Sequence, residues 1–103
     1  MDITTWGVTV DVSGQFGRTE YLITGTKLAI TSALTDSFPE SCAALRTGWG
    51  ITKATPPAVN GVVVDGVAYN IARPAGTCAA DPELLNKVWG LTQAMVDSAK
   101  AMP

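Results

Sequence analysis

The clearest alternation of apolar and polar positions lies in residues 60–74, on both sides of an Asp65-Gly66 dipeptide. This dipeptide favours two-residue turns that need two positive φ angles, so the segment predicts a β-hairpin. Closing the hairpin there pairs Val64 with Val67. Because side chains alternate along a strand, this register places the following residues on one face that needs burial: Val62, Val64, Val67, Tyr69 and Ile71.

Three more strands are predicted in the first third of the chain. Residues 3–12 alternate, with Trp6 and three valines opposed to threonine, glycine and aspartate. Residues 19–24 and 27–34 flank Gly25 and are rich in β-branched and aromatic side chains. We expect these three segments to form an antiparallel meander.

Two helices are predicted. Ser37 and Glu40 have the spacing of a capping box, which indicates a helix from Ser37 to Thr47. A second helix should begin at Asp81, a good N-cap, with Pro82 at its first position. Apolar positions then recur at helical spacing, as in an amphipathic helix: Leu85, Val88, Met95, Ala99 and Met102.

These elements occur in the order βββ-α-ββ-α within 103 residues. We therefore expect one α+β domain spanning residues 1–103, with a central antiparallel sheet of about five strands and two covering helices. No apolar run is long enough to span a bilayer. The net charge is −2 and the charges are scattered, which argues against a nucleic-acid partner.

The chain contains no histidine, and this limits the chemistry it can perform. Histidine is the usual general base, the partner of Ser and Cys nucleophiles, and a common zinc ligand. The acidic residues occupy turn and helix-start positions, and the glycines lack the spacing of a phosphate-binding loop. We expect no catalytic activity, no metal site and no cofactor.

Cys42 and Cys78 are the two cysteines, and they stand far apart in the sequence. The N-terminal residues lack the basic start and apolar core of a signal peptide. We therefore expect two reduced, buried thiols in a cytoplasmic protein. A Cys42–Cys78 disulfide in an exported domain, or a reactive thiol, are the alternatives.

Trp6 in the first strand and Trp89 in the last helix are candidates for a binding site. If the terminal elements pack side by side, the two rings could line a groove for proline-rich segments, which are ordered before they bind. The alternative is that both tryptophans belong to the core.

Residues Val59 to Arg73 resemble the central hairpin of profilins, with Val59-Asn60-Gly61 before the turn and Arg73-Pro74 at the end. The helix predicted at 37–47 and the closing helix also fit the profilin plan. The resemblance implies a cytoskeletal protein that binds monomeric actin, proline-rich segments or both. It assigns Arg73 to actin and leaves Trp6 and Trp89 for proline. Ala68 stands where profilins often have a lysine.

Two other functions fit the sequence. Low charge and many Gly, Ala and Thr residues suit a subunit of a homo-oligomer or of a viral or multiprotein assembly. A Cys42–Cys78 bridge would suit an exported binding or inhibitor domain. Mass as a function of concentration tests the first alternative, and intact mass before and after reduction tests the second.

Overall fold

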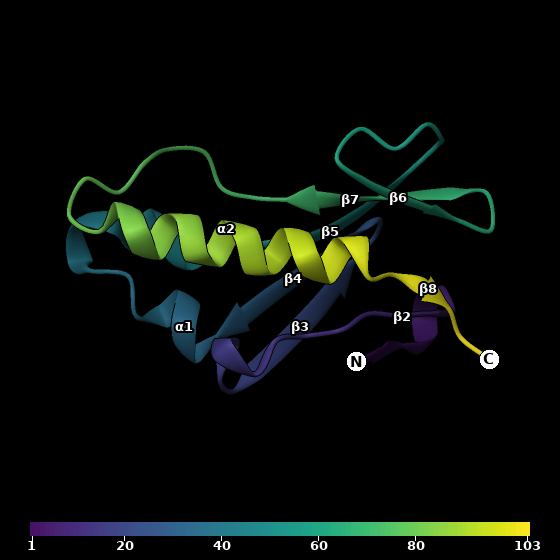
Figure 1. Ribbon diagram of the computed structural model, residues 1–103, viewed down its shortest axis with the longest axis horizontal. Helices are drawn as coiled ribbons and strands as arrows, with labels where there is room; N and C mark the ends of the chain where they lie inside the picture. The colour runs from purple at the N-terminus through teal and green to yellow at the C-terminus, as the bar shows by residue number, and fades with distance from the viewer.

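The computed structural model describes residues 1–103 as an antiparallel sheet with one long helix laid across it (Figure 1). None of the helices is both long and apolar enough to cross a membrane. The elements, in chain order, are β1 (Asp2–Ile3), η1 (Thr4–Trp6), β2 (Val8–Thr9), η2 (Gly14–Phe16), β3 (Thr19–Thr24), β4 (Lys27–Ser32), α1 (Ala33–Asp36), η3 (Glu40–Arg46), β5 (Gly50–Ala54), β6 (Gly61–Val64), β7 (Val67–Ala72), α2 (Pro82–Asp97) and β8 (Lys100–Ala101).

The main sheet has five strands in the order β3-β4-β5-β7-β6, and every neighbouring pair is antiparallel. The α+β class and the five-stranded antiparallel sheet are therefore as predicted. The β6–β7 hairpin has the expected register, with Val64 opposite Val67 and Val62 opposite Tyr69. Asp65 and Gly66 adopt φ angles of 49° and 78° at its turn, as the two-residue loop requires.

One face of this sheet bears the hydrophobic core, a single cluster of 16 buried residues. Leu28, Ile51 and Ile71 lie side by side across β4, β5 and β7 on this face. Helix α2 covers it with Val88, Met95 and Val96, all fully buried. Residues that alternate with these on the strands, such as Leu22 and Ala29, are not part of the cluster. Helix α2 and the core therefore cover one face of the sheet, whereas on the opposite face Ala68 and Asn70 of β7 are buried but Leu22 of β3 is exposed.

The predicted start of α2 is confirmed, but the helix ends at Asp97, and Lys100–Ala101 form β8 although the apolar pattern continued to Met102. Asp81 caps the helix by accepting a hydrogen bond from the Leu84 backbone N–H at 3.0 Å, and Pro82 is the first helical residue. A carboxylate at the N-cap satisfies a backbone donor that has no partner within the helix.

The predicted strand over residues 3–12 is wrong. Gly7, at φ 68°, ends a short 3₁₀ turn between the two-residue strands β1 and β2. These strands join β8 in a separate three-stranded sheet, which brings both termini to one end of the molecule (Figure 1). The place left in the main sheet is taken by β5, which the sequence pattern did not predict. The β-favouring run of β5 is only a few residues long and lies between Gly50 and the Pro56-Pro57 pair, so the local sequence gave no strand signal there.

The helix predicted at 37–47 is also wrong. The chain forms the short α1 and then the 3₁₀ segment η3, which is interrupted by non-helical φ and ψ angles at Cys42. The capping box is at Ser32 and Thr35, whose side chains and backbone N–H groups bond reciprocally. Ser37 instead ends α1, and its hydroxyl donates back to the Leu34 carbonyl.

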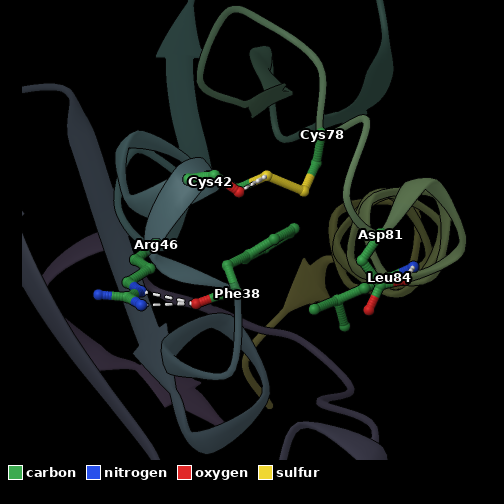
Figure 2. The surroundings of a disulfide bond; sticks show 7 residues. Phe38, Cys42, Arg46, Cys78, Asp81 and Leu84 are labelled. Carbon is green, nitrogen blue, oxygen red and sulfur yellow. Dashed lines mark hydrogen bonds between the residues drawn. A yellow bond between two sulfur atoms is a disulfide. The ribbon is translucent and has the colours of Figure 1, made fainter.

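Cys42 and Cys78 form a disulfide, with Cα atoms 5.6 Å apart. It ties η3 to the loop before α2, and both sulfur atoms lie in the core beside Phe38 (Figure 2). The expected free thiols are therefore wrong, and so is the expected cytoplasmic location. Structural disulfides persist in oxidising environments and are rare in the cytosol. The bridge thus indicates an extracellular or exported setting.

Candidate protein-binding surface

Arg73 and Trp89 are in direct contact. The Arg73 guanidinium carbon lies 3.9 Å from the centroid of the Trp89 ring, a cation–π geometry. Trp89 is 39 % exposed, which is high for a tryptophan, and Arg73 is exposed as well. Such a contact at an exposed site contributes about 0.5–1 kcal/mol. Its main effect is to hold a large aromatic side chain in one orientation at the surface.

The fold brings these residues together from distant parts of the chain. Arg73 directly follows β7, and Trp89 lies in the middle of α2, which packs against β7. Trp89 neighbours Val88, which is fully buried, and successive residues of a helix point about 100° apart. Trp89 therefore lies at the border between the buried stripe of α2 and solvent.

The same surface continues one helical turn further. Gln93 follows Trp89 at the i+4 position, so both side chains lie on the same side of α2. Its Nε2 donates to the Asn60 carbonyl and to Asp97 Oδ1, each at 3.0 Å. The neighbouring Val59 is 87 % exposed. We call this set the α2–hairpin surface: Val59, Asn60, Arg73, Trp89 and Gln93.

Asn70 fixes the loop part of this surface. Its Oδ1 accepts hydrogen bonds from the backbone N–H groups of Val59 and Asn60, at 2.9 and 3.1 Å. Asn70 is buried on β7. A surface whose backbone is fixed in this way loses less conformational entropy when a partner binds.

Trp6 lies in different surroundings. Its ring packs against Tyr69, with centroids 6.0 Å apart and planes at 43°, and the Lys53 ammonium lies 5.3 Å from its centroid. Burial, with a smaller contribution from the Asp65 carboxylate, raises the pKa of the Tyr69 hydroxyl. The structure thus gives Trp6 and Trp89 separate partners rather than pairing their rings. It does unite Arg73 and Trp89, which the sequence had assigned to different ligands.

The sequence did not predict a role for Trp49 or Gln93, or that Val59 would be exposed. Trp49 is the tryptophan that is fully buried, and its indole N–H donates to the Leu45 carbonyl at 2.7 Å. The glycines on both sides of Trp49 were a signal that the backbone bends there. Gln93 could have been found from its spacing to Trp89, but its bond to Asn60 depends on how α2 docks.

The α2–hairpin surface combines an exposed tryptophan with an exposed arginine. No three His, Cys, Asp or Glu side chains lie close enough together to hold a metal ion. The two salt bridges, Arg18–Glu20 and Arg46–Glu40, involve exposed carboxylates. Tryptophan and arginine are the residues most enriched among the anchors of protein–protein interfaces.

Comparison with protein-family models, with curated proteins and with solved structures finds no significant match to this chain.

Proposed function

We propose that this chain is a non-catalytic protein-binding domain of an oxidising environment, and that it binds proline-rich segments on the α2–hairpin surface. The observation that carries the proposal is the Arg73–Trp89 stack, an exposed and oriented indole beside a guanidinium. Proline-rich segments pack their rings on such aromatic faces. Their carbonyl groups are free to accept hydrogen bonds, and Arg73 supplies several donors.

The resemblance of residues 59–73 to the profilin hairpin supports the same proposal. It implies proline-rich ligands and monomeric actin, with Arg73 as the actin contact. Because Arg73 touches Trp89, a partner that contacts one of these residues also meets the other. The disulfide indicates an environment outside the cytoplasm, where actin is found, so we give the proline-rich ligand first place.

The test is calorimetric titration of the protein with a polyproline peptide of about ten residues. We expect saturable binding that Trp89→Ala and Arg73→Ala each weaken about tenfold or more, as is typical of interface anchors. Trp6→Ala is the matched control, since Trp6 lies away from the Arg73 stack, and we expect its affinity to equal that of the unsubstituted chain.

Trp89 lies outside the core cluster, so its replacement should leave the fold intact, which near-ultraviolet circular dichroism can check. Affinity lost with Trp6→Ala but kept with Trp89→Ala would move the site to the Trp6–Tyr69 pair. A titration of monomeric actin, followed by polymerisation, runs in parallel. Binding of actin that Arg73→Glu abolishes, with no peptide binding, would replace the proline-rich ligand by actin.

A further inference from the structure

Strand β3 forms one edge of the main sheet. The hydrogen-bond pattern of its neighbour β4 shows which backbone groups of β3 have no partner. Just before β4, the Thr26 carbonyl accepts a hydrogen bond from the Lys53 N–H, and on β4 the Ile30 N–H donates to the Trp49 carbonyl. Even-numbered residues of β4 therefore bond toward β5, and odd-numbered ones bond toward β3. By the register, it is the even-numbered residues of β3 that face β4.

The N–H and C=O groups of Thr19, Tyr21 and Ile23 consequently point away from the sheet. None of the turn, loop or side-chain hydrogen bonds uses these groups. Edge strands are normally protected by a proline, a lysine or a bulge, or by very short length. This strand has six residues, TEYLIT, in regular one-to-one register with β4, with no proline, lysine or bulge, and Glu20 is its one charged residue.

The side chains of this edge are also open to a partner. Leu22 is 69 % exposed and Tyr21 is 43 % exposed, among the few large apolar side chains on the surface. Leu22 lies on the face opposite α2, next to Ala29 of β4. The edge therefore combines free backbone groups with apolar side chains on both faces, as strand addition requires.

We propose that β3 pairs antiparallel with β3 of a second copy of this chain, joining two sheets edge to edge with Leu22 on the two-fold axis. Leu22 then faces Leu22 of the second copy in a non-hydrogen-bonded pair, where side chains approach most closely. Tyr21 and Ile23 exchange backbone hydrogen bonds with Ile23 and Tyr21 of the second copy.

The charges on β3 and β4 favour a second copy of this chain as the partner, with Leu22 rather than Tyr21 on the two-fold axis. With Leu22 on the axis, Glu20 lies opposite Thr24 of the second copy, whose neighbour on the same face is Lys27. Two symmetric Glu20–Lys27 ion pairs then flank the leucines. If Tyr21 lay on the axis instead, Arg18 would meet Thr24 and Lys27 of the second copy, which places like charges together. Glu20 and Lys27 are exposed in the single chain. Glu20 already contacts Arg18 through Oε1, at 2.7 Å, so in the dimer its carboxylate is shared between Arg18 and Lys27 of the second copy.

The arrangement has a consequence for binding. A two-fold axis perpendicular to the sheet keeps the covered faces of both copies on the same side. The dimer then presents its two α2–hairpin surfaces on the same side, near the two outer edges of the joined sheet. This suits a long ligand with repeated motifs, because the second binding event becomes intramolecular. This consequence rests on the proposed function, whereas the dimer itself does not.

The experiment measures mass by light scattering over roughly micromolar to millimolar protein, since a single-strand interface is small and associates weakly. We expect a dimer at the upper end. Glu20→Lys and Lys27→Glu should each raise the dissociation constant about tenfold, because both symmetric pairs become repulsive. An equimolar mixture of the two variants should dimerise again, since it restores opposite charges in both pairs. Lys87→Glu on α2, the matched charge control, should leave the dimer unchanged.

Tyr21→Pro is a second test that does not depend on charge. Its N–H points to the free edge, so proline removes a bond to the second copy and none within the chain. We expect loss of the dimer with unchanged circular dichroism. A chain that stays monomeric throughout the concentration range overturns the proposal. So does a dimer that survives Glu20→Lys, Lys27→Glu and Tyr21→Pro, because it must use another surface.

Discussion

Cys42 and Cys78 are 36 positions apart in the chain and are joined by a disulfide that fixes η3 against the loop before α2. Phe38 and Leu45, on the two sides of Cys42, belong to the same core as Val88 of α2. The bridge therefore closes a loop that contains β5 and the whole β6–β7 hairpin. It limits how far the unfolded chain can expand.

We expect the double variant Cys42→Ala/Cys78→Ala to lose roughly 3–4 kcal/mol of unfolding free energy, from the loop entropy that the bridge removes. Urea unfolding with and without a reductant measures this. The reduced, unsubstituted chain should match the double variant. Equal stability of the oxidised and reduced chains would contradict the structural role of the bridge.

Gly50 should tolerate no side chain. A Cβ on Gly50 would collide with the carbonyl oxygen of Leu28 on β4, which is backbone and cannot move aside without breaking the ladder. Gly50→Ala should therefore cost roughly 2–3 kcal/mol of unfolding free energy. Thermal or urea unfolding tests this.

Gly90 is the matched control for Gly50. It lies inside α2, and a Cβ there meets no atom within 4 Å. Gly90→Ala should stabilise the chain by about 0.5–1 kcal/mol, because alanine is the better helix former and restricts the unfolded chain. A destabilised Gly90→Ala variant would show that the helix surface is crowded at this point.

The stability of the fold should fall at high pH because of Tyr69. Burial, then Asp65, raises the pKa of its hydroxyl above the ordinary value of 10.0, so the folded chain keeps a proton that the unfolded chain releases. The stabilisation is complete below pH 10.0 and is lost as the pH rises through the folded pKa. The slope reaches at most about 1.4 kcal/mol per pH unit. Tyr69→Phe should remove this part of the slope, as unfolding curves from pH 8 to 11 can show; an unchanged slope sinks the assignment.

The Asp81 cap should contribute measurably to α2. Its side chain accepts from the Leu84 backbone N–H, and nothing else in the helix can satisfy that donor. Asp81→Ala should cost about 1 kcal/mol of unfolding free energy, whereas Asp81→Asn should cost only a few tenths, since asparagine also caps helices. An equal loss in both variants would mean that charge, and not capping, is what matters.

The sequence correctly predicted those elements whose start or turn is fixed by adjacent residues. The Asp65-Gly66 turn fixes the register of its own hairpin, and the Asp81-Pro82 pair starts α2, so both followed from the sequence. The helix expected after Ser37 failed because the core fixes Cys42 through its disulfide with Cys78, and η3 bends there. The pattern near Ser37 could not reveal that distant constraint.

The candidate site shows the same division. Arg73 and Trp89 were each recognisable as potential binding residues, but their contact depends on how α2 lies against β7. Gln93 and Val59 join them only because Asn70 and Asn60 fix the loop between β5 and β6. No spacing within the sequence reports that arrangement.

By itself, the sequence determined the α+β class, the β6–β7 hairpin and the amphipathic helix α2, because turn chemistry and side-chain periodicity act over a few residues. The tertiary structure alone decided that β5 lies between β4 and β7, that Cys42 meets Cys78, and that Arg73 stacks on Trp89. These pairings join residues far apart in the chain. They are selected by burying one common core, and no local pattern encodes which distant partners that core brings together.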